Sequence, residues 1–367
     1  MTRAVVAIAF TAVAAAVSFQ QVPRAIVLKP PDATLGEPFT SIYSVRELAD
    51  GRVLISDYGQ DNRLVVADLR SGRVRMVGNV GAGPGEYRAA GKLVPLAQDS
   101  TLFIDSPQRG RWWLLLHRDS IVRNLPPDLP ALRTVGGSPS GADSRGRVLG
   151  VRQAGSEKLS NNLIRERLVV VVGDRNGSGA DTVAALRGSE YRISQGGTRE
   201  KPFWAQIQLS GSASEQALMF PDGWIAIVRV DPYFVEWRSP NGTMVHGPQV
   251  RWERPRVDAK EKAAAFGLQS RRYGEKAKDD DRPWAETLAP IRGSALIASP
   301  EGNLLVLRSQ WSQALDTRYD VFDRSGQRVA QLALPDSERV VGFGARSVYV
   351  SMRDGDGFHR LRRHPWP

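Results

Sequence analysis

Carboxylates beside strand-like segments are the first residues in this chain that could do chemistry. Four of them follow apolar runs typical of strands: Asp57, Asp105, Asp231 and Asp316. Grouped around a channel, carboxylate and carbonyl oxygens of this kind could bind Ca²⁺. Alternatively, an aspartate such as Asp57, with Asn62 and Arg63 nearby in the sequence, ties strands together through charge-assisted hydrogen bonds. For each carboxylate alone, we prefer the structural interpretation.

Other motifs for catalysis or metal binding are missing or incomplete. The chain has no cysteine, which excludes a disulfide framework, a thiolate metal site and a cysteine nucleophile. None of its four histidines pairs with another at H-x-x-x-H spacing. The glycine-rich loop Gly81–Gly85 lacks the lysine and hydroxyl of a phosphate-binding loop, and Gly137–Gly141 places proline where a nucleophilic serine would stand. We therefore predict no catalytic residues, no metal ligands and no cofactor, with Ca²⁺ possible only if the protein is an enzyme.

Aromatic and arginine residues are the strongest indication of a binding face. Tryptophan and arginine are enriched at interaction hot spots, although a large β-protein also needs many tryptophans for its core. Several tryptophans stand beside arginine or in irregular stretches of the chain. The ligand-binding candidates are Arg111, Trp112, Trp204, Trp284 and Trp311.

Positioning these residues requires a repeated β architecture. A turn pair followed by an apolar run recurs at positions 51, 100, 146, 223, 302 and 347, separated by 49, 46, 77, 79 and 45 residues. Three of these intervals match a four-stranded propeller blade of roughly 40 to 50 residues. The two long intervals contain insertions, at about 187–214 and 251–283, and the second includes the alanine-rich helix expected at Lys260–Gln269.

The predicted fold is an all-β, six-bladed β-propeller with four-stranded blades that spans residues 25–367. The last repeat is one strand short, whereas Ala25–Lys29 reads as a spare strand at the other end. We therefore expect Ala25–Lys29 to provide the outer strand of the sixth blade.

The first eighteen residues read as a signal peptide. A positive start with Arg3 precedes the apolar run Ala4–Val17, and Ala16-Val17-Ser18 fits a cleavage site. We expect a periplasmic or secreted protein with no integral membrane segment after cleavage. The net charge is +11, but the arginines are scattered, and an exported protein seldom meets nucleic acid. Nucleic acid is therefore not an expected partner.

One part of the chain resembles a known family. Ile55-Ser-Asp57, Asn62-Arg63 and the apolar run up to Asp68 resemble an NHL repeat, and Gly81–Tyr87 resembles the glycine-rich link between NHL blades. The match extends over Ser44–Tyr87 and is weaker elsewhere. The chain thus resembles secreted bacterial six-bladed β-propellers with NHL-like repeats, most of which lack a known activity. The resemblance implies the fold but no shared function.

Two functions follow as hypotheses. The first is a non-catalytic binding or scaffold module, expected to be a monomer, for a protein, peptide or glycan ligand. The alternative is a propeller enzyme similar to the metal-dependent lactonases or the streptogramin lyases.

Overall fold

The computed structural model describes residues 23–105, 112–125, 135, 139–174, 179–197, 202–273, 283–309 and 316–367. In these residues nearly all regular structure is β, and α2 (Ala259–Tyr273) is the one helix that lies entirely within them. No helix of this part of the chain is long and apolar enough to cross a membrane. Arg111 and Trp311, two of the predicted ligand-binding residues, lie outside the described residues.

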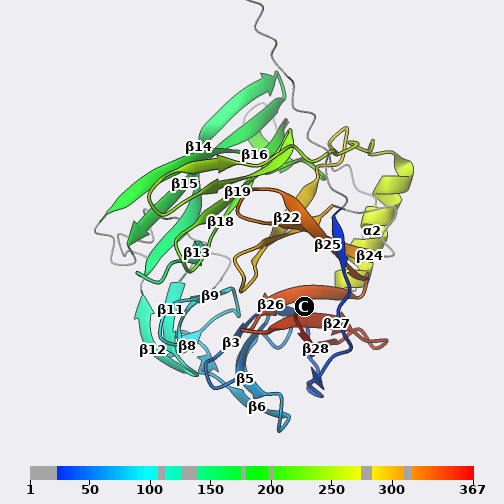
Figure 1. Ribbon diagram of the computed structural model, residues 1–367. Coiled ribbons are helices and arrows are strands. Elements are labelled where there is room, and N and C mark those ends of the chain that lie inside the picture. Colours follow the sequence, from blue (N-terminus) through cyan, green and yellow to red (C-terminus); the bar gives the residue numbers. More distant parts are fainter. Residues whose placement is uncertain are drawn as a thin grey trace, which may run out of the picture.

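The strands form six principal sheets, numbered here in chain order (Figure 1). Sheet 1 contains β3 (Ile42–Glu47), β4 (Val53–Asp57), β5 (Arg63–Asp68) and β6 (Arg73–Met76). Sheet 2 contains β9 (Leu93–Pro95), β10 (Ser100–Asp105), β11 (Trp112–His117) and β12 (Ser120–Leu125). Sheet 3 has five strands: β13 (Pro139–Ala142), β14 (Arg147–Ser160), β15 (Leu163–Asp174), β16 (Ala180–Gly197) and β17 (Pro202–Gln208).

The second half of the chain continues this pattern. Sheet 4 contains β18 (Gln216–Met219), β19 (Ile225–Val230), β20 (Tyr233–Arg238) and β21 (Met244–His246). Sheet 5 contains β22 (Ile291–Ala298), β23 (Leu304–Arg308), β24 (Asp316–Phe322) and β25 (Arg328–Pro335), and β1 (Arg24–Ile26) joins its outer edge. Sheet 6 contains β26 (Glu338–Phe343), β27 (Ser347–Arg353) and β28 (His359–Pro365), with β2 (Ala33–Thr34) at its outer edge.

The turns between strands carry the residues that the sequence predicted. Gly51, Gly146, Gly223 and Gly302 each lie between the first and second strands of a sheet, with φ between 82° and 87°. This left-handed conformation is readily adopted by glycine. The loop Gly81–Gly85 joins the short parallel strands β7 (Asn79–Val80) and β8 (Glu86–Tyr87) between sheets 1 and 2, as expected of a link rather than a phosphate site.

Each sheet packs against the next one through its own hydrophobic cluster. Six clusters join sheets 1 and 2, 2 and 3, 3 and 4, 4 and 5, 5 and 6, and finally 6 and 1. In the last of these, Tyr349 and Leu361 of sheet 6 pack with Ile42 of sheet 1. Both faces of each sheet are thereby covered by neighbours, as in a β-propeller, and burial of this apolar surface stabilises the arrangement.

The prediction that Ala25–Lys29 provides the outer strand of the last sheet is wrong, because another N-terminal segment takes that place. Of Ala25–Lys29, only Ala25 and Ile26 form a strand: they belong to β1, which pairs in parallel with β25 of sheet 5, whereas β2 pairs antiparallel with β28 and completes sheet 6. Pro30 and Pro31 separate the two strands. Pairing with β25 ends at Ile26, and the two prolines, which have no N–H to donate, lie in the connection that leads to sheet 6.

The first insertion also differs from expectation. Instead of an irregular polar stretch at 187–214, β16 continues to Gly197 and β17 adds a fifth strand to sheet 3. The helix in the second insertion is confirmed. Asp258 caps it, because the Asp258 carboxylate accepts a hydrogen bond from the Glu261 N–H at 2.9 Å.

Candidate functional site

The structure separates the two predicted site tryptophans whose side chains it describes. Trp204 lies on β17 with 67% of its surface exposed. Trp284 is partly buried against α2, where its ring meets Phe266 edge-on at 5.7 Å and lies 5.9 Å from the Lys262 ammonium. Trp284 therefore packs against α2 and stabilises its position. The backbone of Trp112 belongs to β11, while its side chain lies outside the described residues.

The aspartates predicted to be structural do stabilise the sheets. The buried Asp57 accepts hydrogen bonds from the N–H groups of Thr40 at 3.2 Å and Ser41 at 2.7 Å. Asp105 does the same for Arg88 at 3.0 Å and Ala89 at 2.8 Å. Burial raises the pKa of Asp57, although these bonds oppose the shift.

The four candidate carboxylates do not gather into a metal site. Asp231 pairs with Arg254, and Asp316 pairs with Arg318 at 3.4 Å. Among the described residues, no group of three His, Cys, Asp or Glu side chains could hold a metal ion.

A groove lies between sheets 3 and 4 in the described part of the chain. Its volume is about 670 Å³, within the range of roughly 300–1,000 Å³ typical of ligand sites. Seven of the lining residues are apolar: Ala154, Leu168, Val169, Ala185, Leu186, Pro232 and Phe234. The other seven are charged: Glu157, Arg167, Arg187, Glu215, Arg229, Asp231 and Glu236.

Unequal strand lengths create this groove. The strands β14, β15 and β16 contain 14, 12 and 18 residues, whereas β19 and β20 contain 6 each. Sheet 3 therefore extends past sheet 4, as the long green strands in Figure 1 show. One wall of the groove belongs to this extension, and the other belongs to β19 and β20.

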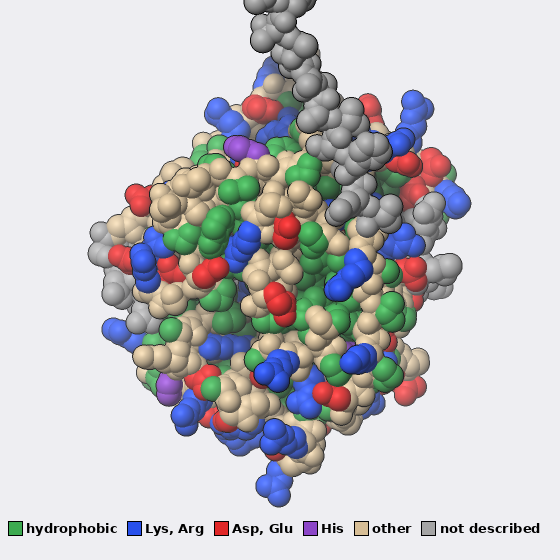
Figure 2. Space-filling view, in the orientation of Figure 1, with side chains coloured by type: hydrophobic (Ala, Val, Ile, Leu, Met, Phe, Trp, Pro, Cys, Tyr) green, Lys and Arg blue, Asp and Glu red, His purple; other side chains and the backbone are tan. Residues whose placement is uncertain are grey.

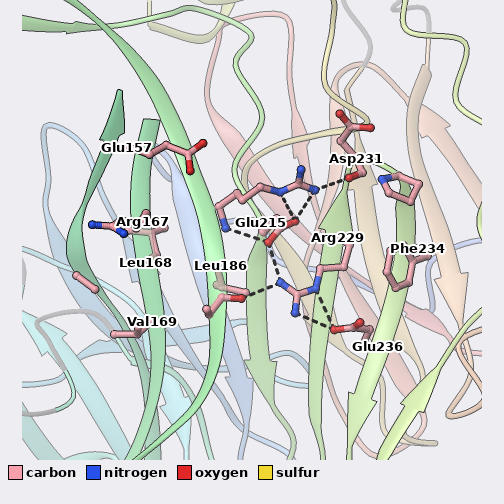
Figure 3. A pocket seen from close by; sticks show the side chains of 14 residues that line it. Glu157, Arg167, Leu168, Val169, Leu186, Glu215, Arg229, Asp231, Phe234 and Glu236 are labelled. Atoms are coloured by element: carbon pink, nitrogen blue, oxygen red, sulfur yellow. Dashed lines mark hydrogen bonds and ion pairs between the residues drawn. The ribbon is translucent and has the colours of Figure 1, made fainter. Parts of the chain in front are cut away.

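Glu215 lies at the centre of the groove and binds two arginines (Figure 3). Its side chain is only 2% exposed. Its carboxylate accepts hydrogen bonds from the Arg187 N–H at 2.9 Å and Nε at 3.1 Å, and from Arg229 Nη1 at 2.8 Å. Arg187 belongs to sheet 3 and Arg229 to sheet 4, so Glu215 connects the two walls.

Arg229 extends this network into sheet 4. Its Nε donates to Glu236 Oε2 at 2.9 Å, and its Nη1 donates to the Ala185 carbonyl at 2.8 Å. Glu236 also contacts His246 Nδ1 at 3.0 Å. Burial alone would lower the pKa of Arg229, but the hydrogen bonds and charges of Glu215 and Glu236 outweigh it and raise this pKa. Arg229 therefore stays charged.

The described lining residues combine apolar surface with paired charges. None of these fourteen residues is Ser, Thr, Cys, Tyr, Lys or His, so they contribute no hydroxyl, thiol, amine or imidazole to the groove. The carboxylates of Glu215 and Glu236 are already hydrogen-bonded to arginine. Those of Glu157 and Asp231, 43% and 51% exposed, lie in contact with solvent and pair with arginines.

The two insertions approach one another beside this groove. The Ser210 N–H donates to the Pro283 carbonyl at 2.8 Å, and the Ala285 N–H donates to the Ser210 carbonyl at 3.0 Å. Each insertion leads from the outer part of one sheet to the first strand of the next.

In the view of Figure 2, Lys and Arg side chains are interspersed with acidic and apolar surface, as the scattered arginines of the sequence predicted.

The sequence did not reveal the groove. The long interval between positions 146 and 223 marked an insertion, but we assigned it to 187–214 alone. Five of the fourteen lining residues lie between Ala154 and Val169, on β14 and β15. The apolar run Leu168–Val172 was the available strand signal there, and the charged Arg165-Glu166-Arg167 before it shows no alternation that would predict a longer strand.

Comparison with known proteins identifies no family. No protein-family model matches the chain, and no curated protein matches it. Among solved structures, the chain is similar to a protein of unknown function from Bacteroides thetaiotaomicron, with 10% identity and a TM-score of 0.40, covering 90% of this chain and 70% of the other. It is also similar to the calcium-binding protein regucalcin from Agrobacterium tumefaciens, with 14% identity and a TM-score of 0.37, covering 92% and 96%. It is similar as well to virginiamycin B lyase from Staphylococcus aureus, with 11% identity and a TM-score of 0.38, covering 91% of this chain and 98% of the other.

Identities and TM-scores this low carry no information about activity. The β-propeller architecture therefore rests on the sheets and the clusters between them.

Proposed function

We propose that this protein is an exported, six-bladed β-propeller of the NHL-like kind that binds a peptide segment of another protein in the groove between sheets 3 and 4. The observation that carries the proposal is the groove itself, with an apolar wall and a charged floor that is neutralised internally. Support for six blades comes from the six sheets and the six clusters that join each sheet to the next.

The composition of the groove favours a peptide over a glycan. Glycan sites commonly use aromatic faces, and Phe234 is the one aromatic residue of the lining. A peptide can instead place an apolar side chain against Leu168 and Leu186 while its polar groups meet the charged residues at the rim. Because Glu215 and Glu236 together balance the charges of Arg187 and Arg229, an apolar side chain does not have to displace water from an unpaired charge.

Filling the groove tests this function. Peptides selected from a displayed library on the purified protein should lose at least about tenfold in affinity for the Ala154→Trp variant, a change of about 1.4 kcal/mol. Ala154 is exposed and lines the groove, so a larger side chain there costs no core packing. Ala333→Trp on β25 is the matched control, because Ala333 is also an exposed strand residue but lies in sheet 5. Failure to enrich any peptide, or equal binding by both variants, would contradict the proposal.

Export has a separate test. When the full chain is expressed in a Gram-negative host, N-terminal sequencing of the periplasmic or secreted protein should show cleavage near Ser18. A protein that retains Met1 and stays in the cytoplasm would refute this location.

A further inference from the structure

The strand β16 extends well beyond the strand that pairs with its outer side. β17 pairs only with Tyr191–Gly197, although β16 begins at Ala180. Among the described residues, no strand pairs with the outer edge of β16 between Ala180 and Leu186. We propose that the peptide binds along this edge in an extended conformation, as an added strand that exchanges backbone hydrogen bonds with Ala185. This inference rests on the proposed function and specifies how the peptide is held.

The backbone groups of Ala185 point away from β15. Two residues further on, the Arg187 N–H donates to Glu215 Oε2 at 2.9 Å, and the Arg187 carbonyl accepts from the Glu215 N–H at 2.8 Å. Because the direction of these groups alternates along a strand, those of Ala185 face the same side as those of Arg187. The Ala185 carbonyl agrees, since it accepts a hydrogen bond from Arg229 Nη1 at 2.8 Å. The Ala185 N–H is therefore a donor directed outward from the sheet.

The groove provides the space beside this donor. Ala185 is exposed, and both Ala185 and Leu186 line the cavity of about 670 Å³. In Figure 3, Leu186 and Phe234 lie on opposite sides of the groove. A β-bulge at Val183 interrupts the regular pairing of β16 with β15, so the regular edge open to a peptide is short and centres on Ala185.

The composition of this edge suits a peptide strand. Thr182–Leu186 contains no charged residue, whereas natural edge strands are commonly protected from pairing by charge. Strand addition is a recurrent mode of peptide recognition, in which backbone hydrogen bonds provide affinity and pockets for alternate side chains provide specificity. Leu186 and Phe234 supply apolar surface for such side chains. Peptides that bind the groove should therefore carry apolar residues at alternate positions.

Replacing backbone amides of the peptide with esters tests the pairing. The probe is the tightest peptide selected from the displayed library, resynthesised with one ester at a time, which removes one N–H and leaves every side chain in place. Esters at the position that pairs with Ala185 should lower the affinity about tenfold, and esters at the adjacent positions should change it less than about twofold. An equal effect at all positions would overturn strand pairing and leave groove binding intact. Failure to enrich any peptide would instead contradict the proposed function.

A substitution in β16 tests the same bond from the other side. Ala185→Pro removes the outward N–H and leaves the inward-facing groups of Ala184 and Leu186 in place, so it should lower peptide affinity about tenfold. The matched control Ala185→Ser keeps the N–H at nearly the same size and should bind as the wild type does. A folded Ala185→Pro variant, shown by unchanged circular dichroism, that binds peptide as tightly as Ala185→Ser would refute the proposal.

Hydrogen exchange of the wild type provides a test that needs no variant. Addition of the selected peptide should slow amide exchange in the segment from Ala180 to Arg187. The outer strand β6, Arg73–Met76, is the control and should exchange as before. Exchange that stays unchanged over Ala180 to Arg187 when the peptide is bound would refute strand pairing.

Discussion

The substitution Glu215→Gln should destabilise the protein by about 3 kcal/mol, the lower end of the range for breaking a buried ion pair. The Glu215 side chain is 2% exposed, and Arg229 and Arg187 are 20% and 43% exposed. Glutamine keeps one acceptor oxygen but turns an amide donor toward arginine N–H groups, which are donors too. Arg229 would then lose one of its two carboxylate partners. Arg187 can regain water, which is why we use the lower end of the range.

The measurement is urea unfolding at pH 7 and low ionic strength, because guanidinium would screen the charges. Glu157→Gln is the matched control, since Glu157 lies in the same groove but its side chain is 43% exposed and its ion pair with Arg165 is solvated. We expect that control to lose at most about 1 kcal/mol. If Glu215→Gln costs no more than Glu157→Gln, Glu215 does not hold the two walls together and our interpretation of the groove floor is wrong.

Three further predictions concern other parts of the chain. Burial lowers the pKa of Lys92 to about 8, so its acetylation rate, followed by mass spectrometry, should rise with a midpoint near pH 8, and a rate that reaches no plateau above that pH would contradict this. Gly247→Ala would bring a Cβ within 2.4 Å of a backbone oxygen of the adjacent turn and should cost about 1–3 kcal/mol by urea unfolding, whereas Gly355→Ala, with open space around it, should be neutral. The pKa of Asp119 lies below its usual range, because burial raises this pKa but the hydrogen bonds and charges of its arginine partners lower it more. Asp119 therefore stabilises the fold above its unfolded pKa, near 4, and this contribution is lost as the pH falls through the depressed value, so Asp119→Asn should differ from the wild type at pH 7 and much less at pH 2.

The repeat was predictable because its signals are local. A turn such as Asp50-Gly51 adopts its conformation through glycine at one position, and the apolar run Val53–Ile55 after it forms a buried strand. These signals located the first hairpin of most sheets. The capped helix α2 was also predictable, since helix propensity depends on neighbouring residues.

Strand pairing over long distances was not predictable in the same way. Both β1 and β2 lie near the N-terminus but pair with β25 and β28, far along the chain. Nothing in Ala25–Lys29 specifies which outer edge it joins. The partner of each strand depends on where the two outer edges lie in the folded molecule, which no local signal records.

The groove was harder to predict than the fold for the same reason. Glu215 joins Arg187, 28 residues earlier, to Arg229, 14 residues later. Its sequence surroundings, Ser214-Glu215-Gln216, contain no motif. The pair of arginines becomes recognisable only when sheets 3 and 4 lie side by side. Trp204, a ligand-binding candidate expected in an irregular stretch, lies exposed on the strand β17, and its role in binding stays a prediction.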